Sequence, residues 1–144
     1  MDIFSIQNIK KYTLTYIIAT FFVVYIFNIP TLITNAVNLV KEYYYDNILG
    51  SLILDYFLIF IYLNICLYFI KKYNIVDLYK KIFIVILITF LISNLFYIIF
   101  INLPKSNNFF SRWFYKVGIK ASFYDCIIIL VTYLIYNLFK SYSI

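Results

Sequence analysis

The sequence predicts an all-α integral membrane protein in which four spanning helices form one bundle, a single membrane domain of residues 1–144. Two observations predict this class. Hydrophobic residues make up 65% of the chain and charged residues 12%, with a mean hydropathy of +0.93, whereas soluble domains are about 45–50% apolar and about 25% charged. The apolar residues gather in four stretches of 19 to 24 residues, close to the roughly 20 that cross a ~30 Å hydrocarbon core as a helix. An ordinary soluble domain, a disordered tail and a coiled coil are excluded.

The predicted spans cover about residues 12–35, 48–70, 82–103 and 121–139. Pro30 lies near the end of the first span, and proline cannot donate the backbone hydrogen bond that a continuous helix needs. We therefore expect a kink there, or a helix that ends early with residues 31–38 at the membrane interface. Tyr43, Tyr44 and Tyr45 follow, where an aromatic belt forms.

An interfacial helix is predicted at about residues 108–120, before the fourth span. Its cations Arg112, Lys116 and Lys120 recur every four residues. Trp113 lies on a neighbouring stripe with Phe109 and Val117, and this pattern is typical of a helix with its rings in the acyl boundary and its cations at the phosphates. We expect a lipid-anchored connector, and a docking surface for a partner protein or for anionic lipid headgroups is the alternative.

Four spans place both termini on one side of the bilayer. Seven cations fall on that side, namely Lys10, Lys11, Lys71, Lys72, Lys80, Lys81 and Lys140. Five fall on the other, namely Lys41, Lys105, Arg112, Lys116 and Lys120. The positive-inside rule favours cytoplasmic termini, and the short lysine-rich loop of residues 71–81 is its strongest marker. Because the cations lie beside the spans, the net charge of +6 indicates contact with lipid phosphates rather than nucleic acid.

Asp55 and Asp125 are the charged residues inside the predicted spans, where a charge needs a partner, water or neutralisation. Both spans enter from the same side, which places the carboxyls roughly 10 Å and 6 Å into the helices at about 1.5 Å per residue. Ser51 shares a face with Asp55, and Ser122 shares one with Asp125. Asn28 marks a polar face of the first span, and we expect these faces to meet inside the bundle.

Three explanations of the aspartates stay open. They are structural, hydrogen-bonded to Tyr, Ser, Asn or a cation such as Lys120; or they belong to a proton or cation path; or they are catalytic. The chain has no histidine, and its two cysteines, Cys66 and Cys126, are not a redox pair and fall near opposite faces. No nucleophile or metal-ligand set accompanies the aspartates, so we expect no enzyme activity, no metal site and no cofactor.

A two-helix unit is a candidate duplication. An Asn-x-Pro sequence occurs at residues 28–30 and again at 102–104, each followed by an aspartate in the next span. A duplicated helix pair keeps its orientation and gives a parallel repeat with an axis along the membrane normal.

The composition is dominated by 29 Ile, 17 Tyr, 16 Phe, 12 Asn and 11 Lys. In this it resembles the small multi-span membrane proteins of giant, A/T-rich DNA viruses, and it is also similar to proteins of mollicutes and malaria-like parasites. The resemblance implies a viral membrane protein of the virion or of host membranes.

The residues themselves predict a non-enzymatic structural or assembly component of a viral or cellular membrane. The alternative is a small proton or cation transporter or channel subunit that uses Asp55 and Asp125. Four helices rarely enclose a pathway alone, so that alternative implies a homo-oligomer or a complex with another membrane protein.

Overall fold

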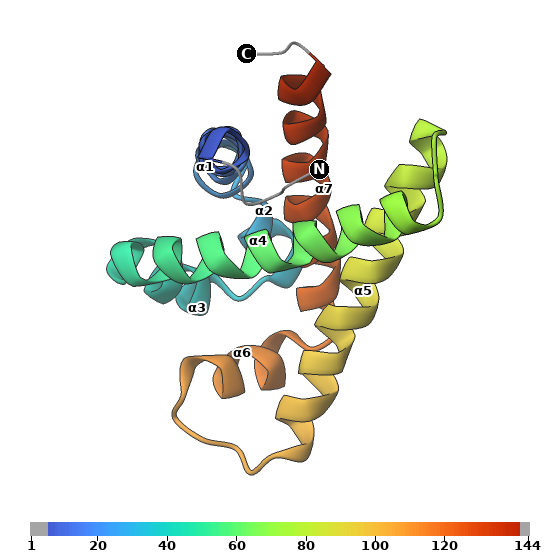
Figure 1. The fold of residues 1–144 in the computed structure, drawn as a ribbon. Helices are drawn as coiled ribbons and strands as arrows, with labels where there is room; N and C mark the ends of the chain where they lie inside the picture. The colour runs from blue at the N-terminus through green and yellow to red at the C-terminus, as the bar shows by residue number, and fades with distance from the viewer. Residues whose placement is uncertain (1–5, 142–144) are drawn as a thin grey trace.

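The computed structural model describes residues 6–141, which form helices and turns without a strand (Figure 1). Four stretches are long and apolar enough to cross a membrane. They are α1 (Ile6–Thr20) with its π-helical continuation η1 (Phe21–Ile26), α4 (Ile48–Lys72), α5 (Leu78–Asn102) and α7 (Lys120–Ser141). Shorter elements connect them, namely α2 (Ile29–Thr34), α3 (Val37–Lys41), η2 (Glu42–Asp46) and α6 (Phe109–Val117). The predicted all-α class with four apolar spans is confirmed.

Helix α7 is the centre of the fold, because it contacts α1, α2, α4, α5 and α6. In Figure 1 α7 runs upright, α4 passes across it, α5 runs obliquely and α1 is viewed along its axis. The helices therefore cross widely rather than lie parallel. Residues of α7 such as Ile129, Thr132 and Tyr133 are almost completely buried.

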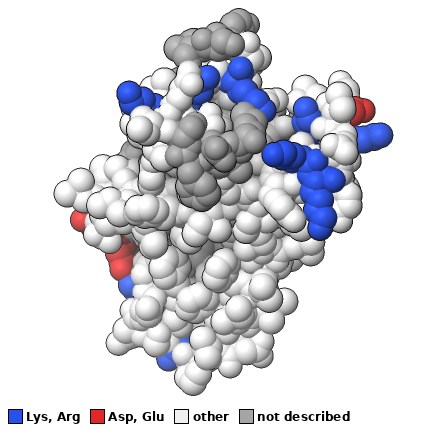
Figure 2. All heavy atoms as spheres, viewed as in Figure 1, with Lys and Arg blue, Asp and Glu red and all other residues white. Residues whose placement is uncertain are grey.

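The charged residues lie away from a broad apolar belt. Figure 2 shows lysine side chains gathered over the α4–α5 turn and the nearby ends of α1 and α7, with an uncharged surface beside them. Large apolar side chains such as Ile17, Phe57 and Leu91 are exposed on the long helices. An exposed apolar surface of this extent is what a bilayer, rather than water, would cover.

The first apolar helix ends at Ile26, nine residues before the predicted end of that span at residue 35. Asn28 follows in the left-handed conformation with φ 47°, and Pro30 stands in the first turn of α2. Proline is well placed in a first turn, because its missing N–H would have no partner there. Of the two expectations for this segment, the helix that ends early is correct. The prediction of one continuous helix over residues 12–35 is wrong.

Sharp turns between the helices use left-handed backbone. Asn28, Asn35 and Asn74 have φ values of 47°, 54° and 50°. Asparagine tolerates this region better than most residues with a side chain. Gly118 joins α6 to α7 with φ 61° and ψ −140°, a combination open in practice to glycine alone.

The predicted polar faces of the second and fourth spans are buried, since Ser51 and Asp55 of α4 and Ser122 of α7 are buried. Ser93 of α5 and Thr132 of α7 are buried as well. The polar face predicted for the first span is not formed, because that helix ends before Asn28 and Asn28 is exposed.

The two cysteines lie closer together than expected. Cys66 and Cys126 are free and buried, and their Sγ atoms lie 3.9 Å and 3.6 Å from the carbonyl oxygens of the successive residues Val85 and Ile86. Their expected separation at opposite faces is wrong, because both approach α5 at the same level.

Tyrosine hydroxyls attach α1 to α4. The Tyr12 hydroxyl donates to the carbonyl oxygen of Tyr56 at 2.5 Å, and the Tyr16 hydroxyl donates to that of Leu52 at 2.7 Å. A helical carbonyl oxygen has a second lone pair for such a bond. Both rings are also buried, so each residue adds apolar contact and one hydrogen bond.

Tyr16→Phe removes one of these bonds and keeps the ring. We expect a loss of about 0.6 kcal/mol in the free energy of unfolding, the average for a hydrogen bond between membrane helices. Reversible unfolding in mixed micelles measures it. Tyr79→Phe is the control, since Tyr79 is exposed, and equal losses in the two variants would contradict the role given to Tyr16.

Candidate functional site

One cavity of about 270 Å³ lies among η2, α4, α5, α6 and α7, and both intramembrane aspartates line it. Asp55 comes from α4 and Asp125 from α7, so the structure brings together the two residues that the sequence singled out. Ten aromatic and five aliphatic side chains complete the lining: Tyr43, Tyr44, Tyr62, Phe96, Phe100, Phe109, Phe110, Trp113, Phe114, Tyr124, Leu54, Leu58, Ile59, Ile128 and Ile129.

The carboxylate of Asp55 is held by η2. The Tyr43 hydroxyl donates a hydrogen bond to Oδ1 of Asp55 at 2.7 Å. Asp55 is 9% exposed, so most of its surface is removed from water or lipid. A buried carboxylate without such a donor would be costly in this surrounding.

The carboxylate of Asp125 is held by α5, where the Ser93 hydroxyl donates to its Oδ2 at 2.5 Å. Ser93 lies nine residues before the end of α5 at Asn102, which is roughly 14 Å along the helix at about 1.5 Å per residue. Asp125, five residues after the start of α7 at Lys120, therefore lies beside a point on α5 well away from the end of that helix. Neither aspartate is paired with Lys120, which is exposed.

Helix α6 forms an aromatic wall of the cavity. The Phe109 ring stacks on Tyr43 with centroids 4.7 Å apart, and Trp113 stacks on Phe109 at 5.9 Å. On the other flank Phe114 stacks on Phe100 of α5 at 5.2 Å. Trp113 is half-buried and lines this cavity.

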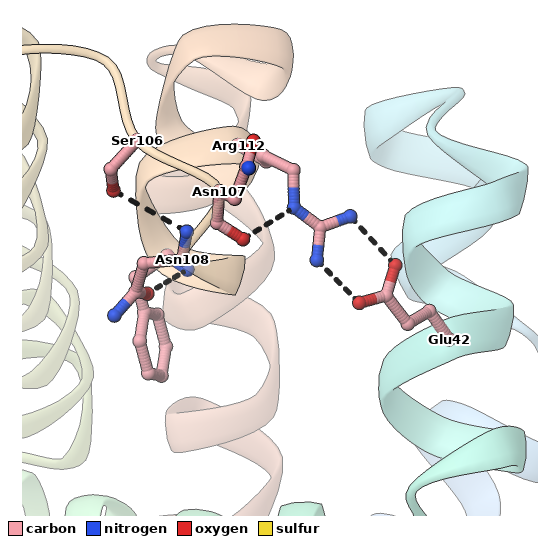
Figure 3. A network of polar contacts seen from close by, with 6 residues as sticks. Glu42, Ser106, Asn107, Asn108 and Arg112 are labelled. Carbon is pink, nitrogen blue, oxygen red and sulfur yellow. Dashed lines mark hydrogen bonds and ion pairs between the residues drawn. The ribbon is translucent and has the colours of Figure 1, made fainter.

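An ion pair fastens α6 to η2. The two terminal nitrogens of Arg112 donate to the two carboxylate oxygens of Glu42 at 2.5 Å and 2.8 Å, and its Nε donates to the carbonyl of Asn107 at 3.2 Å (Figure 3). The guanidinium holds the pKa of Glu42 below its usual value, chiefly by donating these hydrogen bonds. Arg112 is therefore engaged with Glu42, a partner that the helical stripe does not indicate, while its side chain stays 35% exposed.

The other predicted residues lie outside the cavity lining. Ser51 is buried and donates to the carbonyl of Ile48 in its own helix, and Ser122 is buried on α7. Asn28 is exposed between η1 and α2, so the expectation that it accompanies the aspartates is wrong. Lys116 and Lys120 are exposed on the surface, as a lipid contact requires.

Sequence reasoning missed the residues that position the carboxylates. Their positions in the sequence indicate only an aromatic belt for Tyr43 and Tyr44, yet Tyr44 also shares a 2.6 Å hydrogen bond with Tyr124 of α7. With 17 tyrosines in the chain, nothing marked these two. Glu42 is the only glutamate and Arg112 the only arginine in the sequence, but no motif or spacing joins these two residues.

A second, polar hollow of about 730 Å³ lies on the outer side of α6. Lys105 and Lys116 line it together with Asn35, Asn38 and Asn107, and Arg112 reaches it as well. Amide and ammonium groups of this kind can hydrogen-bond the phosphate of a lipid headgroup.

Chemically, the cavity combines two carboxylates, hydroxyl groups and aromatic rings, and its lining contains no lysine or arginine. Among residues 6–141 no group of three or more His, Cys, Asp or Glu side chains could hold a metal ion. The chain matches no protein-family model, no curated protein and no solved structure.

Glu42→Gln removes the charge from the ion pair. At pH 7 we expect faster amide hydrogen exchange across α6 than in the parent protein, with α7 unchanged. Because the folded-state pKa of Glu42 is lowered from 4.5, the contact is present above pH 4.5 and is lost as the pH falls through that lowered value. Fluorescence of Trp113 should report a transition there that the variant lacks.

Lys116→Gln is the matched control, since it removes an exposed charge from the same helix. Exchange across α6 should stay at the parent rate in this variant. Equally faster amide exchange in both variants would contradict the role of the Glu42–Arg112 contact, because loss of any charge near α6 would then have the same effect.

Proposed function

We propose that the protein is a non-enzymatic structural component of a membrane, held together inside the bilayer by polar contacts between its own helices. One observation carries this proposal. Each intramembrane carboxylate accepts a hydrogen bond from another element of the same chain, Asp55 from Tyr43 of η2 and Asp125 from Ser93 of α5. In hydrocarbon such bonds have few competitors, so they select one packing of the helices.

A proton or cation path is the second candidate, and the cavity favours it. Asp55 and Asp125 line a single cavity, with hydroxyl groups of Tyr43, Tyr62 and Tyr124 in the same lining. Carboxylates inside a membrane commonly mark ion and proton pathways.

The membrane context of the proposal has two parts. The lysine-rich α4–α5 turn supports termini in the cytoplasm, and the compositional resemblance suggests a virion or host membrane. The exposed Lys116 and Lys120 and the polar hollow beside α6 support contact with anionic headgroups.

In a background lacking Cys66 and Cys126, an impermeant maleimide should label Lys72→Cys only from the cytoplasmic side and Lys116→Cys only from the opposite side. The reverse labelling pattern would place the termini on the other side of the membrane.

Asp55→Ala tests the structural proposal, because it leaves the Tyr43 hydroxyl without its acceptor. We expect a loss of about 1–3 kcal/mol in the free energy of unfolding, the usual effect of an unsatisfied buried polar group. Tyr43→Phe in the same chain should recover part of that loss, since both polar partners are then absent. Unfolding of the two single variants and the double variant in micelles measures the coupling.

A second measurement separates the two candidate functions. In liposomes loaded with a pH-sensitive dye, the structural proposal expects no proton flux from the protein. Flux in the parent protein that disappears in a folded Asp55→Asn or Asp125→Asn variant would instead establish the path. Additive effects of Asp55→Ala and Tyr43→Phe would remove the support for a structural contact.

A further inference from the structure

We propose that the cavity between α4, α5, α6 and α7 binds a small organic cation, an amine or quaternary ammonium with an apolar body. This inference goes beyond the structural role, and it requires no transport, since a ligand can bind at the carboxylates without crossing the membrane.

The charge of the cavity selects a cation. Two carboxylates line it, and none of the seventeen lining residues is a lysine or arginine. The nearest guanidinium, that of Arg112, is already bound at both terminal nitrogens by Glu42. Acidic groups in a site of low polarity therefore lack an opposite charge within the cavity, and a cationic ligand supplies one.

The carboxylates also have hydrogen-bonding capacity to spare. The Tyr43 hydroxyl uses Oδ1 of Asp55, and the Ser93 hydroxyl uses Oδ2 of Asp125. A carboxylate accepts about four hydrogen bonds through its two oxygens. Asp125 of α7 is only half-buried although its partner Ser93 is buried in α5, which leaves part of the Asp125 side chain accessible from the cavity.

The aromatic lining selects an organic cation over a metal ion. Ten of the seventeen lining residues carry aromatic rings, and the negative face of an aromatic ring attracts an ammonium group within about 6 Å. A bare Mg²⁺ or Ca²⁺ instead needs about six or more oxygen ligands. An ammonium with an apolar body uses both the rings and the carboxylates.

The volume of the cavity limits the size of the ligand, and the residues at its edge indicate the route by which a ligand enters. Its volume of about 270 Å³ lies near the lower end of small-molecule sites, which span roughly 300–1,000 Å³. Phe96 and Leu54 at its border are 41% and 37% exposed on the apolar belt. A ligand that enters past them comes from the bilayer, which suits an amphiphilic amine.

Trp113 provides an internal reporter, since it is the only tryptophan and lines the cavity. Benzyltrimethylammonium, titrated onto the protein in neutral detergent micelles, should change its fluorescence saturably. We expect Asp55→Asn and Asp125→Asn each to weaken the apparent affinity at least tenfold. Asp46→Asn is the matched control, because it removes an exposed aspartate outside the cavity, and it should bind like the parent.

Two further measurements complete the test, one with ligands that carry no positive charge and one with a variant that narrows the cavity. The neutral isostere neopentylbenzene and the anion benzenesulfonate should give no saturable signal at the same concentrations. If the asparagine variants fail to fold by circular dichroism, Leu58→Phe narrows the cavity while keeping both carboxylates, and it should lower the affinity at least tenfold. An equal response to the neutral isostere, an equal effect of Asp46→Asn, or undiminished binding to Leu58→Phe would each overturn the inference.

The result is separable from the proposed structural role. Loss of binding with an intact Asp55–Tyr43 coupling would overturn the cation site and leave the structural role standing. Saturable binding without flux would support both together.

Discussion

Three successive residues of η2 connect most of the molecule. Glu42 binds Arg112 of α6, the Tyr43 hydroxyl binds Asp55 of α4, and the Tyr44 hydroxyl binds Tyr124 of α7. The backbone carbonyl of Tyr44 accepts a further hydrogen bond from Tyr25 of η1 at 3.0 Å. Because hydrocarbon offers polar groups no substitute partner, the bonds of Tyr43 with Asp55 and of Tyr44 with Tyr124 restrict where α4 and α7 can lie. Through these bonds η2 positions both the α6 wall of the cavity and the carboxylate of Asp55.

The cavity exists because the helices cross widely around α7. Parallel helices with small interface residues would approach closely and fill their shared centre. Here α6 folds back between α5 and η2, and its rings close the space between them by stacking on Tyr43 and Phe100. The same arrangement sets Asp125 opposite Ser93, well away from the end of α5 at Asn102. A single geometric cause therefore explains both the hollow and the position of the second carboxylate beside α5.

The sequence predicted well those features that depend on composition along one helix. The four apolar stretches and the burial of Ser51 and Ser122 follow from hydropathy and from residue spacing. It predicted poorly those that depend on contact between elements. Nothing in a helical stripe indicates that Arg112 faces Glu42 rather than lipid, and a span defined by hydropathy does not show that the backbone turns at Asn28. The abundance of tyrosine concealed Tyr43 and Tyr44, because a residue type used 17 times carries little information at any one position.

The left-handed turns have a consequence for how such a chain can evolve. Codons for glycine are rich in G and C, whereas those for asparagine are rich in A and T. A gene that drifts toward A and T loses glycine, and glycine is the usual residue at backbone turns of positive φ. In residues 6–141 the non-glycine residues of positive φ are Asn28, Asn35 and Asn74, all asparagine. Glycine is retained at residue 118, where ψ of −140° lies beyond what asparagine readily adopts. The base composition of a gene can thus shift far while the backbone path is kept, provided that the few positions open to glycine alone are spared.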